Sequence, residues 1–310
     1  MKRKMEVSEL VFKIIAYVVL VIFALMCVYP LIYVLSAAFS GKAPVKNGDI
    51  VLWPMDVQGG AFLAVFKENM FWVSYANTLF VTFFGTLWAL GYSILGAYAL
   101  SKKRLMGRKG WNFFLVFTMW FSAGIIPQYT NYINTYDVFT AIGVVDFKWL
   151  IVISMGMNAT NIILLRNSFE GVPSEIEEAA RIDGATEMQV LTKVYIPMSK
   201  STIATVALFF GISRWNGYFW ARRVSEGYNQ DYSWPIQVYI RDYLEKMTYI
   251  ISSPDEAGLD AINKLEAEGN YSTSSIAYAM IICAIVPILC IYPFIQKYFA
   301  KCVNMGGVKE

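Results

Sequence analysis

The stretch IIAYVVLVIFALMCVYPLIYVLSAA, residues 14–38, contains no charged side chain. A helix needs about 20 mostly apolar residues to cross the hydrocarbon core of a bilayer, so this stretch is long enough to span a membrane. The rest of the 310-residue chain has a similar character, since 57% of all residues are hydrophobic and only 16% are charged. This composition predicts an all-α integral membrane protein.

Further apolar stretches follow the first, so that the sequence predicts six membrane-spanning helices. Their ranges are 14–38, part of 69–101, 111–126, 149–165, 202–220 and 275–296. Pro30 lies inside the first stretch and predicts a kink there, or an early end to that helix. The expected organisation is a membrane domain of residues 14–296 between terminal tails of residues 1–13 and 297–310.

Lysine and arginine predict the side of the membrane on which each loop lies, because short cytoplasmic loops retain positive charge. Basic residues gather in three segments, residues 2–13, 102–109 and 297–309. With six spans these segments share one side, so both termini are predicted to be cytoplasmic. Segment 221–274 is richer in acidic than in basic residues. We expect it to form a small amphipathic helical cap outside the membrane.

The composition also excludes several functions. Histidine is absent, which removes the usual base of a hydrolytic triad. The four cysteines, at 27, 283, 290 and 302, form no CxxC pair, so neither a zinc site nor a disulfide framework is indicated. The net charge is only +3 and no basic stripe is present, which argues against a nucleic-acid partner. We therefore expect no catalytic residue and no metal site.

Residues 174–197, SEIEEAARIDGATEMQVLTKVYIP, form the most strongly patterned polar segment, and the six-span prediction places them in the cytoplasm. Ser174 followed by Glu177 predicts a capping box, in which the hydroxyl accepts from a backbone N–H and the carboxylate reaches back. Gly184 suits the left-handed backbone of a helix C-terminal cap. One short helix is therefore predicted between Ser174 and Gly184.

A second helix is predicted to follow directly, because Thr186 and Gln189 repeat the capping-box spacing. Its apolar face consists of Met188, Leu191 and Tyr195. Pro197 is tolerated in the first turn of a helix, so it marks the start of the next span. By pattern alone, the two helices could equally form an amphipathic pair lying on the bilayer surface.

Three parts of this segment resemble a known motif. They are Glu178-Ala179-Ala180, then Gly184 after three residues, and finally Val194-Tyr195-Ile196-Pro197. This arrangement resembles the EAA motif of ABC importer permeases, from which it departs by Val194 for Ile and Ile196 for Leu. The resemblance implies a coupling helix that docks in a cleft of an ATPase subunit. The docking residues it implies are Glu178, Ala179, Ala180, Arg181, Asp183, Gly184 and Ala185.

The same resemblance implies the partners of this chain. The phosphate-binding pattern GxxxxGK[ST] is absent, so this chain is expected to bind no cofactor, and ATP and Mg²⁺ are expected on the partner ATPase. The implied assembly contains a second homologous permease subunit, two cytoplasmic ATPase subunits and an extracellular solute-binding lipoprotein. It would lie in a bacterial cell membrane, in contact with lipid.

Three further stretches point to a substrate class. They are Arg214-Trp215-Asn216 with Trp220, Trp234-Pro235-Ile236-Gln237, and the segment 292–299. They resemble carbohydrate importer permeases of the maltose-type branch, within it the oligosaccharide or aldouronate group. This implies inward transport of an oligosaccharide by alternating access. An importer of peptides or polyamines remains an alternative, as does a secondary transporter or membrane anchor, although no inverted repeat or paired intramembrane acids are found.

Six residues are candidates for the substrate pathway: Arg214, Trp215, Asn216, Asn158, Asn161 and Trp120. A charge inside a span is costly unless it is paired or faces a cavity, so Arg214 could bind a sugar hydroxyl or carboxylate. It could equally belong to a structural ion pair or contact a headgroup. Asn158 and Asn161 could instead hydrogen-bond between helices, and Trp120 could anchor the chain at the membrane interface.

Overall fold

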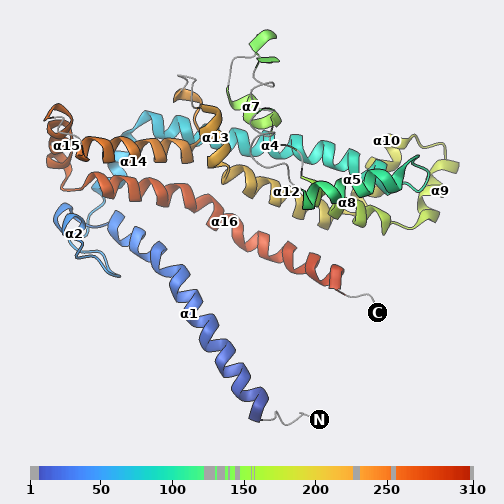
Figure 1. Ribbon diagram of the computed structural model, residues 1–310, viewed down its shortest axis with the longest axis horizontal. Helices are drawn as coiled ribbons and strands as arrows, with labels where there is room; N and C mark the ends of the chain where they lie inside the picture. The colour runs from blue at the N-terminus through green and yellow to red at the C-terminus, as the bar shows by residue number, and fades with distance from the viewer. Residues whose placement is uncertain are drawn as a thin grey trace. The chain divides into compact units, whose positions relative to one another are not determined.

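The computed structural model describes residues 7–121, 130, 137–138, 140–143, 147–154, 156, 158–225, 231–252 and 256–307. Within these residues the chain is helical and contains no strand (Figure 1). The chain divides into two compact units, unit 1 with residues 1–71 and 240–286, and unit 2 with residues 72–239 and 287–310. The predicted α-helical fold is confirmed for the described part.

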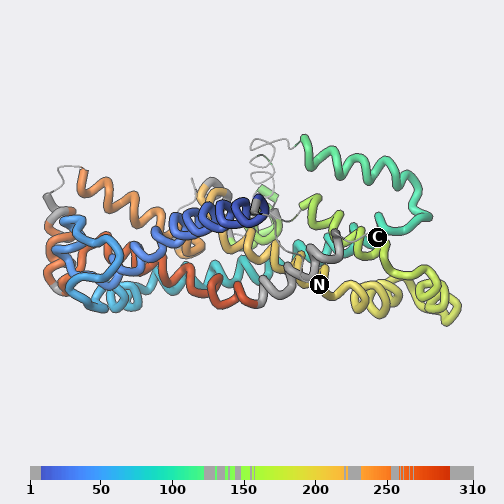
Figure 2. The backbone as a smooth tube through the Cα atoms, turned by 90° about the horizontal axis from the view of Figure 1, so that it is seen from below, coloured from blue at the N-terminus to red at the C-terminus, as the bar shows by residue number. Residues whose placement is uncertain are grey.

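Eight of the described helices lie in residues 7–120 and 236–307. They are α1 (Val7–Ala38), α2 (Lys42–Asn47), α3 (Gly60–Lys67), α4 (Asn69–Ser101), α5 (Arg108–Trp120), α14 (Ile236–Ser252), α15 (Glu256–Gly269) and α16 (Thr273–Gly307). The predicted kink at Pro30 does not end α1, which continues as one helix to Ala38 (Figure 2).

The middle of the chain consists of shorter helices. They are α7 (Phe147–Ser154), α8 (Ala159–Glu170), α9 (Ser174–Ile182), α10 (Glu187–Val190), a π-helix (Leu191–Tyr195), α11 (Ile196–Met198), α12 (Lys200–Trp215), α13 (Tyr218–Ser225) and a 3₁₀ turn (Asp231–Ser233). Helices α13, α14 and α15 account for the described part of the predicted helical cap.

Three helices in the described part are long and apolar enough to cross a membrane. They are Ser8–Ala38, Asn69–Ser101 and Thr273–Pro293, and they coincide with the first, second and sixth predicted spans. The segments Glu187–Met198 and Lys200–Trp215 pass the same test together, but they meet at an angle of 87°. Of the third predicted span, α5 covers residues up to Trp120, and residues 122–126 lie outside the described part.

The fourth predicted span, residues 149–165, is wrong as a single helix. Helix α7 ends at Ser154, and α8 begins at Ala159 with Asn158 as its N-cap. Between them, a Cβ on Gly156 would overlap the Tyr92 hydroxyl oxygen, so a larger residue there would require the Tyr92 side chain to move. Residues 149–165 were predicted as one helix because they carry no charge. The N-cap at Asn158 and the close contact at Gly156 depend on backbone geometry, which hydrophobic composition does not reveal.

The fifth predicted span, residues 202–220, is also interrupted. Helix α12 ends at Trp215 with Asn216 as its C-cap, and α13 starts separately at Tyr218. Asn216 and the following Gly217 are poor residues for a helix interior, which explains the break at this point. Apolar composition predicts burial in a membrane and does not reveal where backbone hydrogen bonds change partners.

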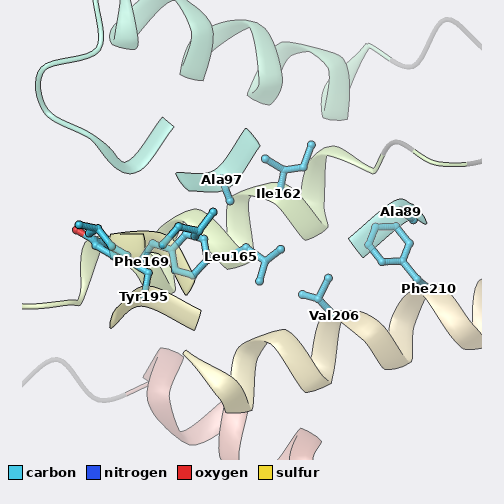
Figure 3. Close-up of a cluster of buried hydrophobic side chains, with 10 residues drawn as sticks. Ala89, Ala97, Ile162, Leu165, Phe169, Tyr195, Val206 and Phe210 are labelled. Carbon is cyan, nitrogen blue, oxygen red and sulfur yellow. The ribbon is translucent and has the colours of Figure 1, made fainter. Parts of the chain in front are cut away.

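The core of unit 2 joins α4, α8, α10, the π-helix and α12 around small, branched and aromatic side chains (Figure 3). Its buried members are Ala89, Ala97, Ile162, Leu165, Phe169, Val190, Leu191, Tyr195, Val206 and Phe210. Ala89 and Ala97 are the members that come from α4. Phe169 lies beside Tyr195 (Figure 3), and their ring centroids are 5.6 Å apart. This core holds the segment after α9 against the end of α4.

Unit 1 is held by a buried carboxylate. Glu266 of α15 is only 1% exposed and pairs with Lys42 at 3.1 Å and Lys46 at 2.5 Å. The backbone N–H of Thr273 donates to the same carboxylate at 3.2 Å. Burial alone raises the pKa of Glu266, but the two lysines outweigh burial, and the pKa lies below its usual value. These contacts tie α2 to the start of α16.

Candidate functional site

The segment with the coupling-helix pattern forms α9, and its two ends are built differently from each other. The N-cap is Pro173, with no side-chain cap bond, so the capping box predicted for Ser174 and Glu177 is wrong. The C-terminal cap at Gly184 is confirmed, because its φ of +81° is left-handed. The N–H of Gly184 donates to Arg181 and that of Ala185 to Ala180, both at 3.0 Å, which is a Schellman motif.

The second predicted capping box is confirmed and starts α10. The backbone N–H of Thr186 donates to the Gln189 side chain at 2.8 Å, and the Gln189 N–H donates to the Thr186 hydroxyl at 3.4 Å. The π-helix that follows replaces the regular helix expected here. Its wider turn changes the angular register, so Leu191 and Tyr195 are buried while Met188 is 59% exposed. Met188 is therefore not part of the buried apolar face, contrary to the prediction.

Helix α9 has an outer face and an inner face. The outer face is exposed and mixed in character, and it consists of Glu175, Glu178, Ala179, Ile182 and Asp183. Ile182 is 86% exposed. Within the described residues, Glu178 and Asp183 form no ion pair. The inner face consists of Glu177, Ala180 and Arg181, and Ala180 packs against the core of unit 2 together with Ala185.

The predicted docking residues are thus divided between two surroundings. Glu178, Ala179, Asp183 and Gly184 are exposed, whereas Ala180, Arg181 and Ala185 are half-buried. Ala179 and Ala180 are both among the docking residues that the resemblance implies. Ala180 instead lets α9 approach its own unit, and Ala179 alone remains on the outer face.

Glu177 is the centre of the contacts on the inner face. Its carboxylate pairs with Lys102 at 2.8 Å and accepts from the Tyr195 hydroxyl at 2.5 Å. Arg181 donates to it from Nε at 3.1 Å and from Nη2 at 2.8 Å. Partial burial by itself raises the pKa of Glu177, but bonds from Lys102, Tyr195 and Arg181 outweigh burial and lower that pKa to about 2. The carboxylate is therefore ionised at neutral pH.

Lys102 directly follows the last residue of α4, and its side chain is only 9% exposed. Its ammonium lies over two aromatic rings, 4.1 Å from the Tyr98 centroid and 3.9 Å from the Tyr195 centroid. The two rings pack edge to face with centroids 5.1 Å apart. Burial lowers the pKa of Lys102, and the Glu177 carboxylate opposes that shift. Ion pair and cation–π contacts together replace the water that the ammonium has lost.

A second carboxylate links the same elements nearer the surface. Glu187, the first residue of α10, pairs with Arg181 at 2.7 Å and with Arg104. It also accepts from the Tyr98 hydroxyl at 2.8 Å. Glu187 is about half exposed, so each of these contacts stabilises less than its buried counterpart at Glu177. The result is that α9, α10 and the loop after α4 are held together by two carboxylates.

A cavity of about 640 Å³ lies between α9 and the loop after α4. Its lining includes Lys102, Arg104, Arg108, Glu170, Glu177 and Arg181. Arg108 pairs with Glu170, and the other cations of this group pair with Glu177 or Glu187. No cluster of metal-ligating side chains occurs among the described residues. The arrangement can hold a helix rigidly and present its outer face to another protein.

Arg214 of the predicted substrate pathway is buried at the break in the fourth predicted span. Its guanidinium donates to the backbone carbonyl of Ile151, and to that of Val152 at 3.0 Å. Both carbonyls belong to the last turn of α7, whose acceptors have no partner within that helix. Gly85 gives the guanidinium room, since a Cβ there would lie 3.0 Å from its Nε.

The other predicted pathway residues have separate surroundings. Trp215 is buried and packs edge to face on Tyr75, with centroids 6.1 Å apart, while Asn216 is exposed. The Asn158 side chain accepts from the backbone N–H of Asn161 at 3.1 Å, so Asn158 caps α8. Asn161 is buried, and Trp120 at the end of α5 is 81% exposed.

Several residues at this site were not predicted to belong to it, namely Lys102, Arg104 and Glu187, whereas Tyr195 was predicted only as part of the motif and of an apolar helix face. Lys102 had been used only to orient the membrane topology. Its signal in the sequence is a lysine one turn after Tyr98 and directly after an uncharged span, where solvation of the ammonium is incomplete. Nothing local connects it to Glu177, because Glu177 lies 75 positions further along the chain.

Comparison with known proteins gives full-length similarities. The chain is 35% identical over 298 residues to the polygalacturonan/rhamnogalacturonan transport system permease protein YtcP of Bacillus subtilis (strain 168), covering 96% of this chain and 98% of that protein. It is 32% identical over 282 residues to Protein LplC of the same organism, covering 91% and 89%. No family model matches the chain.

A solved structure resembles the whole chain as well. It is the crystal structure of a bacterial ABC transporter involved in the import of the acidic polysaccharide alginate. The matched chain is 39% identical, with a TM-score of 0.80, and the match covers 96% of this chain and 100% of that one.

Proposed function

Because this chain belongs to the permease subunits of carbohydrate ABC importers, we propose that it carries uronic-acid oligosaccharides inward and is driven through α9 by a separate ATPase. The single observation that carries the coupling part is the two-sided construction of α9. Its inner face is bonded to its own unit, and its outer face is left exposed with an apolar Ile182 beside acidic groups. A helix built in this way can transmit force from a bound partner.

The membrane topology in this proposal has six spans with both termini in the cytoplasm. The distribution of lysine and arginine supports it, and the three long apolar helices agree with it. Residues 166–200, which include α9, then lie in the cytoplasm, where ATP and Mg²⁺ are available to a partner ATPase. Segment 221–274 then lies outside, where a solute-binding lipoprotein delivers the substrate. A second, similar permease subunit completes the pathway.

The docking face consists of Glu178, Ala179, Ile182 and Asp183. Ile182 supplies apolar area that is costly to leave in water, and Ala179 has no side chain to obstruct a partner. The carboxylates of Glu178 and Asp183 can accept charge-assisted hydrogen bonds from basic residues of the ATPase. Gly184 ends the helix, so the docking face is confined to the one short helix α9. Arg181 supports this face from behind through Glu177 and Glu187.

The proposed substrate class is inferred from the proteins to which this chain is similar. Two proteins similar over nearly the full length are named for polygalacturonan/rhamnogalacturonan and for alginate. Polygalacturonan and alginate are both polymers of uronic acids, so an acidic oligosaccharide is the common chemistry. Under this proposal the pathway residues Arg214, Trp215, Asn216, Asn158, Asn161 and Trp120 act mainly by shaping the helices around the passage, as the contacts of Arg214 and Asn158 suggest.

The coupling proposal is tested by co-purification of the ATPase with the permease. Ile182→Asp places a charge on the docking face, and we expect it to abolish ATPase co-purification while the permease still inserts into the membrane. Ile251→Asp is the matched control, because Ile251 is 62% exposed on α14 and lies outside the docking segment. Retention of the ATPase by Ile182→Asp would contradict the proposal.

The substrate proposal is tested separately with the complete importer in proteoliposomes. Oligogalacturonides or alginate oligosaccharides should stimulate ATP hydrolysis in the presence of the binding protein, and neutral maltooligosaccharides should not. Stimulation by the neutral sugars alone would assign the protein to a neutral branch of the family and leave the coupling proposal intact.

A further inference from the structure

We infer that Lys102, Glu177, Tyr98 and Tyr195, called here the Lys102 clamp, form the joint through which movement of α9 reaches the transmembrane helix α4. This inference rests on the proposed function, since it concerns how the docked helix drives the spans. The residues are positioning residues and touch neither ATP nor substrate.

Each side of the clamp belongs to a different element. Glu177 lies on the inner face of α9, Lys102 follows the last residue of α4, and Tyr195 ends the π-helix. Lys102 meets Glu177 at 2.8 Å and lies over the Tyr195 ring at 3.9 Å. Tyr195 in turn donates to Glu177 at 2.5 Å. Every pair among these three residues is thus in direct contact.

Such a closed triangle resists displacement better than the apolar contacts nearby. Ala180 and Ala185 pack against the core without directional bonds, so α9 could slide or lift on them. An ion pair that is largely withheld from water is directional, and separating it would leave a buried charge without its partner. The side chain of Lys102 is 9% exposed and that of Glu177 is 17% exposed. Pulling or pushing α9 therefore moves the end of α4.

The π-helix is part of the joint. A π-helix widens one turn and is a local departure from regular geometry that is common at functional positions. Here it buries the Tyr195 ring between Phe169 and Tyr98 and directs its hydroxyl to Glu177. The ring holds the ammonium of Lys102 from one side and the hydroxyl holds the carboxylate from the other. Tyr195 thereby fixes both members of the ion pair.

The docking face is separate from the clamp, which makes the two roles distinguishable. Glu178 and Ile182 are exposed on the outer face, whereas Glu177 faces inward. Removing the clamp leaves the surface offered to the ATPase unchanged in composition. Loss of the clamp should accordingly weaken transmission without preventing docking.

The experiment uses the complete importer, with its partner permease, ATPases and binding protein, in proteoliposomes. Glu177→Gln and Lys102→Met each remove one charge with little change in shape. The measured quantity is substrate transported per ATP hydrolysed, together with ATPase co-purification and permease abundance. Lys246→Met is the matched control, since Lys246 is an exposed lysine that pairs with Asp242 at 2.7 Å on α14, outside the clamp.

We expect transport per ATP to fall at least about fivefold in each single variant, with the ATPase still bound at the wild-type ratio. The double variant should transport no less substrate per ATP than the single variant with the lower ratio, because both changes break the same joint. Lys102→Arg keeps the charge and should restore most of the transport per ATP. Tyr195→Phe, which removes only the hydroxyl, should give a smaller loss than Glu177→Gln.

Two results would overturn the inference. One is an unchanged ratio of transport to ATP hydrolysis in both single variants, which would show that the clamp carries no movement. The other is loss of the ATPase from both, which would place Glu177 and Lys102 in docking itself. Retention of the ATPase by Ile182→Asp would instead contradict the proposed function, so the two failures are told apart.

Discussion

Arg214 of α12 donates to the backbone carbonyl of Val152, 3.0 Å away in the last turn of α7. This contact explains how a helix can stop in an apolar segment where no water is available to satisfy its carbonyls. A positively charged side chain at a helix C-terminus is also favoured by the helix dipole. Arg214, the charge inside the fifth predicted span, therefore binds the backbone carbonyls at the break in the fourth predicted span.

Replacement of Arg214 by leucine should destabilise the protein. The change leaves the carbonyls of Ile151 and Val152 without this donor, and an unsatisfied buried acceptor costs about 1–3 kcal/mol. We expect a lower melting temperature of the purified importer, with Arg214→Lys intermediate because it keeps a donor. Unchanged stability with weaker substrate affinity would show instead that Arg214 acts on the substrate.

Gly184 should tolerate substitution according to backbone conformation and not according to size. Its φ is +81°, but no atom outside its two chain neighbours lies within 4 Å of the position a Cβ would take. Gly184→Asn should therefore support uptake close to wild type, since asparagine enters the left-handed region readily. Gly184→Val should abolish most uptake by misdirecting the chain into α10. Uptake of labelled oligosaccharide at equal permease abundance measures both, and equal effects of the two would contradict the conformational argument.

Glu177 should make stability depend on pH in a defined direction. Its pKa falls from 4.5 to about 2 on folding, so its contribution is complete above the higher value and is lost as pH falls from 4.5 towards 2. The melting temperature of the wild type should exceed that of Glu177→Gln at pH 7, and the difference should shrink between pH 5 and pH 3.

The matched control for this measurement is Glu245→Gln. Glu245 forms an exposed pair with Arg241 at 2.7 Å, and exposed pairs contribute little to stability. We expect that control to differ little from the wild type at pH 7. If the difference in melting temperature between wild type and Glu177→Gln persisted undiminished at pH 3, the ionised carboxylate of Glu177 would not be the source of the stabilisation.

Gly156 should accept alanine only if the Tyr92 side chain is displaced. The added Cβ would overlap the Tyr92 hydroxyl oxygen and the ring carbon that bears it. We expect Gly156→Ala to lower thermal stability clearly, and Tyr92→Ala to remove most of that additional loss when combined with it. A melting series of the two singles and the double measures this coupling. Additive effects would show that the two residues do not meet.

Local features of the site were predictable from the sequence. The left-handed cap at Gly184 and the capping box of Thr186 and Gln189 are each determined by residues within one turn, and both are confirmed. The capping box at Ser174 was wrong, because Glu177 has stronger partners in Lys102 and Tyr195 than a backbone N–H. Local pattern could not reveal those partners, since they lie in other elements.

The sequence by itself determined that this is a helical membrane protein with a strongly patterned polar segment, because hydrophobic composition and helix caps act over short distances along the chain. The tertiary structure alone decided where the fourth predicted span breaks, what Arg214 binds and which face of α9 remains exposed. These outcomes depend on buried hydrogen bonds and ion pairs between residues such as Lys102 and Glu177. Their energies arise only when packing removes both partners from water.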